Sequence, residues 1–299
     1  MGNSVVKGFG LEKRLKDGDA DLHRRMRDCV AVLQNTLQLS LARFPTFTDH
    51  SLLHSMNILD FCNRLIGEEQ AGRLTYRECY VIIMACYLHD VGMGISDRDY
   101  AEYLKETDPG EVPDPSGSPD PDAVRSVHHE LSAWFIRKYA DLLDIPSEEL
   151  AIAIAQVSRG HRKTDLFDTG EYPDTAAGTG GTVNTAYLAA VLRLADEIDV
   201  ARDRNLLYDA LQLTKKRDIE AFGKHDSIRS VEITEDSILL HAEPELPEYE
   251  RLIMETAAKI QETLDYCRAV AAARSGFRIT QERVVILPWK GTDGGTDEN

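Results

Sequence analysis

Residues 81–94 read VIIMACYLHDVGMG. Residues 81–88 form an apolar helical segment, and the adjacent pair His89-Asp90 ends it before a turn that contains Gly92. A carboxylate in so apolar a setting requires a partner, because burying an unpaired charge is costly. A metal ion is one such partner. Alternatively, Asp90 caps the following turn and His89 stands beside it by chance.

Helical patterns flank this segment on both sides. Apolar residues recur at three- and four-residue spacing over 21–43, and Thr75 followed by Glu78 has the pattern of a capping box. Residues 105–123 and 167–183 are rich in Gly, Pro, Asp, Ser and Thr and predict loops. The first of them is a candidate lid, since it separates two groups of polar motifs. We expect helices over residues 21–43, 50–67, 75–91, 124–143, 147–160 and 184–201.

The pattern changes after about residue 217. Residues 230–234 and 237–241 alternate with period two and predict a β-hairpin, followed by a helix over 247–274 and a strand over 279–287. The fold class expected is therefore mainly α. We predict a helical domain over 1–216, a small α+β C-terminal subdomain over 217–290 and a disordered tail over 291–299.

The bulk composition limits the class of protein. The chain has 299 residues, of which 42% are hydrophobic, and no apolar run is long enough to span a membrane. The net charge of −17 argues against extended nucleic-acid binding, which needs a basic surface, but a local cationic cluster could still bind a small anion. The five cysteines form no C-x-x-C pair, and we interpret them as buried hydrophobic residues of a cytoplasmic protein.

Several polar residues at helix ends have the chemistry of metal ligands. Imidazole together with carboxylate suits Mn, Fe, Ni, Co or Zn, and Mg would suit a site richer in carboxylates and water. The candidates are His54, His89, Asp90, His128, His129, His161 and Asp196.

In this order the motifs resemble the HD-domain metal-dependent phosphohydrolase superfamily. The element LHDVG at 88–92 looks like its defining His-Asp pair, and the family pattern adds a first His, up to two further His and a final Asp. The resemblance covers about residues 44–205 and implies an HD-domain helical bundle. The other positions map by motif onto His54 in HSMNI, His128 in RSVHHELS, His161 in RGH and Asp196 in LRLADEID.

The extra histidines imply the two-metal version of the family. In that version Asp90 bridges the ions, one ion is held by His54, His89 and Asp196, and the other by His128 and His161. One or two divalent ions, manganese among them, are the expected cofactors. The catalytic residues implied are Asp90, His128 and His161, with a metal-activated water as nucleophile.

Some assignments have alternatives. His50 lies four residues before His54 and could share its helix face, but the Ser-x-x-Ile flank favours His54. His128 is preferred to His129 because Arg precedes it by three residues and Ser follows it by four.

The substrate's negative charge requires cationic partners. Arginine suits bidentate phosphate contact, although each of these residues could equally belong to a solvated surface cluster. Asp199 either supports the site or pairs with an arginine, and we prefer the ion pair with Arg202. The candidate phosphate-binding residues are Arg159, Arg162, Lys163 and Arg202.

The resemblance implies a hydrolase of a nucleotide or nucleotide-derived phosphate ester or anhydride. The Gly-Tyr-Pro element of the cyclic-di-GMP branch is absent near the third His, and the layout is most similar to a bacterial group linked to stress and phage defence. The alternatives are a metal-binding signalling or interaction module without turnover and a nuclease-type phosphodiesterase. The C-terminal strands could pair with a second copy or a partner protein.

Overall fold

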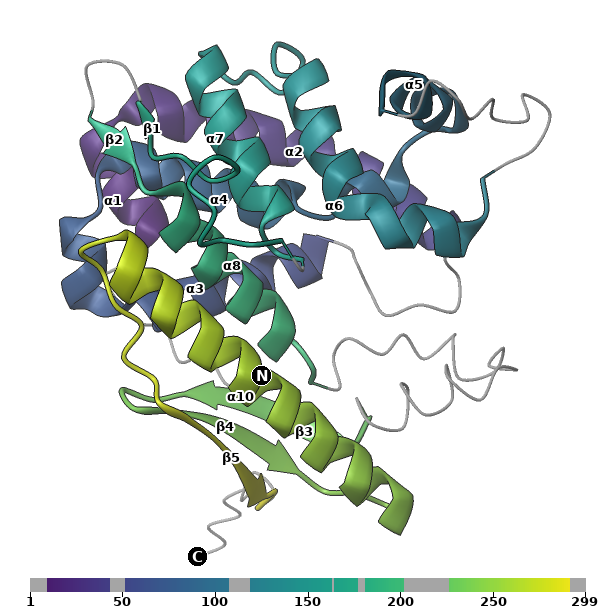
Figure 1. Cartoon of the computed structure of the whole chain (residues 1–299), viewed down its shortest axis with the longest axis vertical. Coiled ribbons are helices and arrows are strands. Elements are labelled where there is room, and N and C mark those ends of the chain that lie inside the picture. Colours follow the sequence, from purple (N-terminus) through teal and green to yellow (C-terminus); the bar gives the residue numbers. More distant parts are fainter. Residues whose placement is uncertain are drawn as a thin grey trace, which may run out of the picture.

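The computed structural model describes residues 10–43, 52–107, 119–162, 164–176, 181–201 and 226–290. A body of helices precedes a small sheet, and one long helix packs against both (Figure 1). The predicted fold class, mainly α with a small α+β part near the C-terminus, is confirmed. The predicted boundary between residues 216 and 217 and the tail after 290 lie outside the described residues.

The helical body carries the elements that build the site. A short antiparallel pair, β1 (Thr175–Ala176) and β2 (Thr182–Val183), lies within the segment predicted as a loop. The helices are α1 (Leu11–Gly18), α2 (Ala20–Arg43), α3 (Leu52–Arg73), α4 (Tyr76–Leu88), the 3-10 turn η1 (Val91–Gly94), α5 (Asp97–Thr107), α6 (Pro121–Lys138), α7 (Glu148–Arg159) and α8 (Thr185–Ile198).

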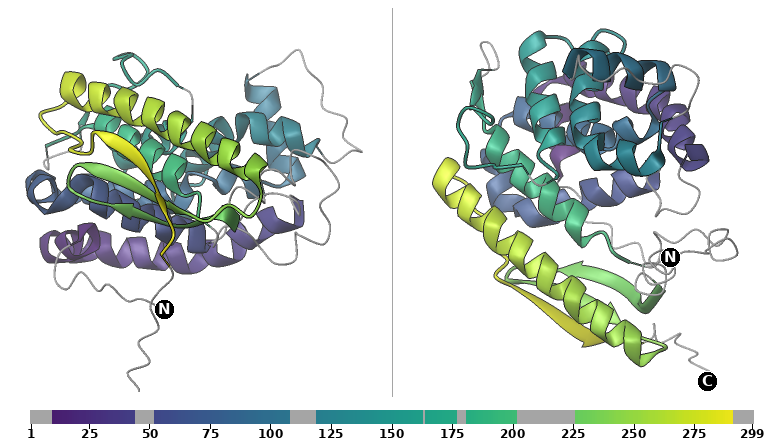
Figure 2. Two further views of the ribbon diagram at one scale, coloured as in Figure 1. Left: turned by 90° about the horizontal axis from the view of Figure 1, so that it is seen from below. Right: turned by 45° about the vertical axis from the view of Figure 1, so that its right-hand side comes forward.

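The C-terminal part is a three-stranded sheet with a long helix. Strands β3 (Ile228–Ile233) and β4 (Ser237–Ala242) form the predicted antiparallel hairpin, whereas β5 (Arg283–Pro288) adds to β4 in parallel. Helix α10 (Pro247–Arg274) packs against both α8 and the sheet, as the two views of Figure 2 show. The metal-site helices and the C-terminal helix therefore share one hydrophobic core.

The loop predicted over 105–123 is wrong at both ends. Residues 105–107 belong to α5, and α6 begins at Pro121 after the N-cap Asp120, whose side chain accepts a hydrogen bond from the backbone of Asp122. A proline at the first helical position is compatible with a helix start, because its missing N–H would have no partner there. Residues 108–118, the centre of the candidate lid, lie outside the described residues.

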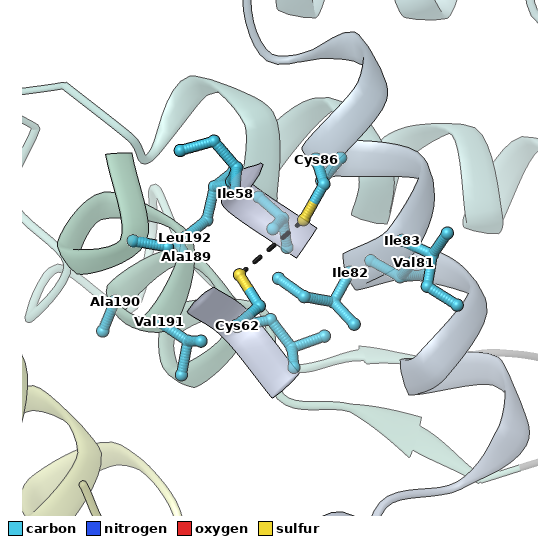
Figure 3. Packing of buried hydrophobic residues seen from close by; sticks show 14 of the residues in the cluster. Ile58, Cys62, Val81, Ile82, Ile83, Cys86, Ala189, Ala190, Val191 and Leu192 are labelled. Carbon is cyan, nitrogen blue, oxygen red and sulfur yellow. Dashed lines mark hydrogen bonds between the residues drawn. The ribbon is translucent and has the colours of Figure 1, made fainter. Parts of the chain in front are cut away.

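Helix α4 is the centre of the core. Every residue from Glu78 to Leu88 except Tyr87 is buried. Figure 3 shows side chains of α3, α4 and α8 packed around Cys62 and Cys86, whose sulfur atoms are 3.7 Å apart. All five cysteines are free and buried, as predicted, and burial raises the pKa of the Cys62 thiol well above its usual value.

Glu78 joins the beginnings of two site helices. Its Oε2 accepts from the backbone N–H of Thr75 at 2.9 Å, which completes the predicted capping box. Its Oε1 accepts from the backbone and side-chain nitrogens of Asn184, at 3.2 and 2.8 Å, just before α8. This buried carboxylate thus fixes α4 relative to α8 and sets where their ends meet.

Among the described residues, no single helix has the length and apolar character needed to cross a membrane. Only α4–η1 taken together with α5 meets that criterion, as a pair bent by 97°.

Candidate metal centre

Five helical elements direct six of the predicted ligands toward one point. His54 lies on α3, His89 and Asp90 follow α4, His128 lies on α6, His161 follows α7 and Asp196 lies on α8. The first five are buried, and the side chain of Asp196 is 20% exposed. The motifs that were separated by up to 142 residues in the sequence are therefore brought together.

The six residues form two groups of possible metal ligands. One group is His54, His89 and Asp196, and the other is Asp90, His128 and His161; within each, the ligand atoms lie within 4.8 Å of one another. This is the division that the family resemblance implies.

Asp90 lies between the two groups. Its Oδ2 is 3.6 and 3.3 Å from Nε2 of His54 and His89. Its Oδ1 is 3.3 and 3.6 Å from Nε2 of His128 and His161. One carboxylate oxygen thus faces each group, which is the placement required of a bridging ligand.

Hydrogen bonds at Nδ1 fix the protonation of the imidazoles. Nδ1 of His89, His128 and His161 lies 3.0, 2.6 and 2.6 Å from a backbone carbonyl oxygen three residues earlier. A carbonyl only accepts, so Nδ1 carries the proton and a neutral ring presents a bare lone pair at Nε2. His54 differs, because its Nδ1 lies 2.6 Å from Oδ2 of Asp199.

The bare nitrogens face one another in pairs. Nε2 of His54 is 3.2 Å from that of His89, and Nε2 of His128 is 2.9 Å from that of His161. Two lone pairs at these distances repel unless a cation, either a proton or a metal ion, lies among them. With carboxylates from Asp90 and Asp196 beside them, this donor set fits divalent ions.

The protonation of the centre without metal is uneven. Burial lowers the pKa of His89, but the charges of Asp90 and Asp196 outweigh it and raise the pKa to about 9. Burial and the neighbouring His89 and His128 hold the pKa of His161 well below its usual value. Burial opposes ionisation of Asp196, yet a hydrogen bond from His54 and the charge of His89 depress its pKa. A divalent ion would displace the proton from His89.

Two glycines allow the helices to approach closely enough. A Cβ on Gly92 would lie 2.4 Å from the carbonyl oxygen of His128 and 2.7 Å from the backbone nitrogen of Ser132. A Cβ on Gly160 would lie 2.5 Å from Cβ of Ala189. Gly92 lies two residues after Asp90, and Gly160 directly precedes His161. A glycine beside a ligand is therefore a sequence feature that could have indicated close helix packing here.

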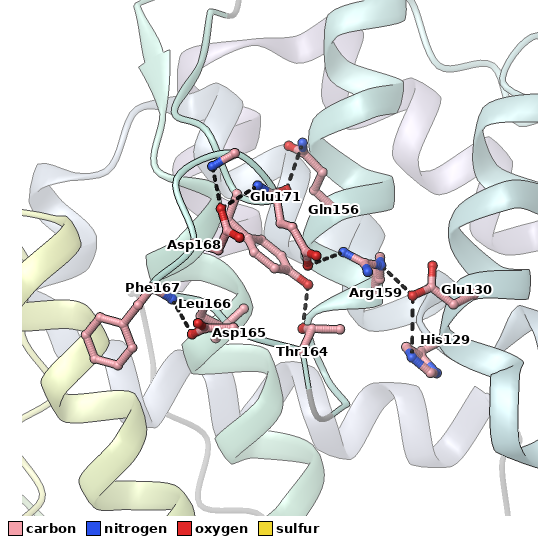
Figure 4. Close-up of polar contacts among 12 residues, drawn as sticks. His129, Glu130, Gln156, Arg159, Thr164, Asp165, Leu166, Phe167, Asp168 and Glu171 are labelled. Atoms are coloured by element: carbon pink, nitrogen blue, oxygen red, sulfur yellow. Dashed lines mark hydrogen bonds and ion pairs between the residues drawn. The ribbon is translucent and has the colours of Figure 1, made fainter.

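The four residues predicted to bind phosphate differ in their surroundings. Arg159 is held by Glu130 at 2.7 Å and Glu171 at 3.0 Å, so its charge is already engaged (Figure 4). Arg162 is exposed, and its side chain makes no ion pair within the described part of the chain. Lys163 and Arg202, like His50, lie outside the described residues.

His129 lies beside the second group without belonging to it. Its Nε2 is 3.7 Å from Oε1 of Glu130, and its Nδ1 is buried with no hydrogen-bond partner among the described residues. Burial, and then the charges of His128 and Arg162, lower the pKa of His129 to about 4. At neutral pH it therefore offers an unpaired nitrogen next to the metal ligands.

The structure shows how two further residues contact the metal ligands or the turn that carries one of them. Asp199, which is 1% exposed, contacts His54 directly, whereas Arg202, its preferred partner in the sequence, is outside the described residues. The other is Arg193, which donates to backbone carbonyls on both sides of His161. Its position three residues before Asp196 in α8 gave no sign of this role.

The chain matches the model of a known protein family. The model of the HD-CE family, an HD-type domain, matches residues 44–271 and so spans the six ligands and most of α10. Domains of the HD type are generally metal-dependent hydrolases. No curated protein matches the chain.

Proposed function

The chain belongs to the HD-CE family, and we propose that it hydrolyses a phosphate ester or anhydride of a nucleotide or nucleotide-derived molecule with two divalent ions. The proposal rests mainly on one observation. Four Nε2 atoms and both oxygens of Asp90 converge, and each imidazole has already committed its Nδ1 proton elsewhere. Such a centre is arranged to receive cations.

The charge of the centre suits a phosphorylated substrate. Bound divalent ions would polarise phosphoryl oxygens and lower the pKa of a water between them. The histidines contribute neutral nitrogens, so Asp90 and Asp196 are the anionic members of the two groups. Two dications against two carboxylates leave an excess of positive charge, which attracts an anion into an acidic protein.

Two residues outside the ligand groups could contact the substrate. Arg162 directly follows His161, is exposed and makes no ion pair with the residues that the structure describes, so its guanidinium can bind a phosphate oxygen. The Nδ1 of His129 is buried and has no hydrogen-bond partner among the described residues, so it could accept a hydrogen bond from a water or substrate hydroxyl that enters beside it. Arg159 instead holds Glu130, the neighbour of His129.

A substrate screen tests the proposal. Purified protein with Mn²⁺ would be incubated with nucleoside mono-, di- and triphosphates, cyclic nucleotides, cyclic dinucleotides and guanosine tetraphosphate, and phosphate or mononucleotide release would be measured. We expect release that requires Mn²⁺, is lost in Asp90→Ala and persists in His241→Ala. His241 is the matched control, since it lies on β4 and pairs with Glu232 away from the centre.

The same screen, with single-stranded oligonucleotides added to the substrates, separates the alternatives. Cleavage of single-stranded oligonucleotides with no turnover of small nucleotides would indicate the nuclease instead. Absence of metal-dependent release from every substrate, by protein that still binds Mn²⁺, would overturn the hydrolase proposal and favour a binding module.

A further inference from the structure

The turn that carries His161 is held by an arginine from another helix. Nε of Arg193 donates to the carbonyl oxygen of Gly160 at 2.8 Å. Its Nη2 donates to the carbonyl oxygen of Thr164 at 2.9 Å and to the Thr164 hydroxyl at 3.0 Å. The Arg193 guanidinium on α8 therefore hydrogen-bonds to the backbone both before His161 and after Arg162.

Some of the other polar contacts of this turn are local. Nδ1 of His161 bonds to the carbonyl of Ser158, and the backbone nitrogen of Thr164 bonds to the carbonyl of Arg162. These contacts orient the ring relative to the end of α7. Two bonds reach further: the Thr164 hydroxyl bonds to the Tyr172 hydroxyl at 2.6 Å, and the Tyr266 hydroxyl donates to the Thr164 carbonyl at 3.5 Å. Gly160 packs closely against Ala189 of α8, the helix that carries Asp196. Among the described residues, the hydrogen bonds that join this turn to α8 come from Arg193.

Helix α10 supports the same arginine from the opposite side. The Arg193 guanidinium lies over the ring of Tyr266, 5.1 Å from its centroid. The Tyr266 hydroxyl accepts from the backbone nitrogen of Leu166 at 2.7 Å, and Arg274 donates to the carbonyl of Leu166 at 2.8 Å. Figure 4 shows the segment from Thr164 to Glu171 that these contacts restrain. The C-terminal helix thus braces the chain just beyond the ligand turn.

We propose that Arg193 is the positioning residue of the second ligand group, and that α10 contributes to this group through Tyr266. Arg193 sets His161 against Asp90 and His128, and it keeps Arg162 at the edge of the centre. The inference rests on the proposed function in one respect, the binding of two ions. Arginine suits this role because its planar fork reaches two carbonyls at once, whereas lysine presents one compact ammonium group.

Metal binding provides the test, with variants Arg193→Met and Arg193→Lys. The matched control is Arg73→Met. Arg73 also donates to a backbone carbonyl, that of Gly276 at 2.7 Å, and lies over an aromatic ring, that of Phe277 at 4.8 Å, but it contacts no ligand turn. Isothermal titration with Mn²⁺ and the metal content of gel-filtered protein would be measured, with circular dichroism and thermal melting to follow the fold.

We expect two ions per chain in the wild type and in Arg73→Met. Arg193→Met should keep one ion at close to wild-type affinity and bind the second at least tenfold more weakly, with Arg193→Lys in between. If Arg193→Met binds both ions like the wild type, or loses both while folded, the proposal is wrong.

The outcome for Arg193 is independent of catalysis. A wild type that binds two ions but hydrolyses no substrate removes the proposed function and leaves the metal-binding result to decide the role of Arg193. A wild type that binds fewer than two ions overturns the two-ion premise itself.

Discussion

Replacing Gly92 with alanine should damage the metal centre from outside the ligand set. The new Cβ would meet the His128 carbonyl oxygen at 2.4 Å, the Ser132 nitrogen at 2.7 Å and Cβ of Leu131 at 2.8 Å. Two of these are backbone atoms of α6, so no side-chain rotation relieves the overlap. Restoring ordinary contact requires η1 and α6 to separate by roughly 1 Å.

The cost can be estimated from two contributions. Over-packing a core by this much destabilises a protein by about 1–3 kcal/mol. Separation also breaks the hydrogen bond from Gly92 N–H to Ser132 Oγ, now 2.9 Å, which contributes about 1 kcal/mol. We therefore expect the free energy of unfolding to fall by about 2–4 kcal/mol. A displacement of His128 from Asp90 by roughly 1 Å should also lower the rate of hydrolysis by about 100-fold.

Gly72→Ala is the matched control. Gly72 lies in α3 with helical backbone geometry, and a Cβ there would meet nothing within 4 Å. Alanine should stabilise that helix by about 0.5–1 kcal/mol. Urea denaturation and Mn²⁺ titration of both variants provide the assay. A Gly92→Ala protein as stable as the wild type, with the second ion bound at unchanged affinity, would refute the close-packing argument.

The remaining predictions concern single groups. His128→Ala should reduce the metal content from about two ions to about one, by elemental analysis, since one group keeps its ligands. Asp199→Asn should weaken the ion held by His54 by about 10- to 100-fold in Mn²⁺ titration, because the imidazole loses its anionic partner. Glu78→Ala should lower the free energy of unfolding by about 2–4 kcal/mol in urea, because buried donors at two helix starts lose their acceptor. Hydrogen bonds from neighbouring hydroxyls hold the pKa of Asp99 below its usual value although burial opposes them, so its stabilisation exists above about pH 4 and is lost as the pH falls. Asp99→Asn should therefore show a smaller loss of stability than the wild type between pH 5 and pH 3, measured by thermal melting.

The order of motifs along the chain was sufficient to select the six residues that the structure brings together. A ligand motif requires a few side chains of fixed type, and that information is local. The contact of Asp199 with His54 was not accessible in this way, because it depends on how α8 ends relative to α3. The hydrogen bonds from Arg193 to Gly160 and Thr164 could not be predicted either, because their acceptors are backbone carbonyls, which every residue type has.

The secondary structure was likewise predictable where neighbouring residues encode it and not where tertiary contacts decide it. The capping box at Thr75 and the hairpin after residue 226 were predicted because each is encoded by neighbouring residues. Helices α1 and α5 were not, because α1 has only Leu11 and Leu15 buried and α5 contributes mainly Tyr103 to the apolar packing. Two or three apolar positions are too few to define a helical period, and tertiary contacts decide such segments.

The outer edge of β5 and the contacts of α10 limit how a partner protein could bind the C-terminal part. Trp289 N–H bonds to the carbonyl of Ala242, so odd-numbered residues of β5 face β4 and even-numbered ones face the open edge. On that edge the N–H of Val284 is bonded to the Gln261 side chain on α10, and Pro288 has no N–H. As far as the described residues show, Ile286 is the one residue of β5 with an edge N–H that has no partner, which disfavours addition of another strand at this edge; β3 forms the other edge of the sheet. Tyr266 of α10 contacts Arg193 and the backbone of Leu166, close to the turn that carries His161. A partner that displaced α10 would therefore also disturb the second ligand group.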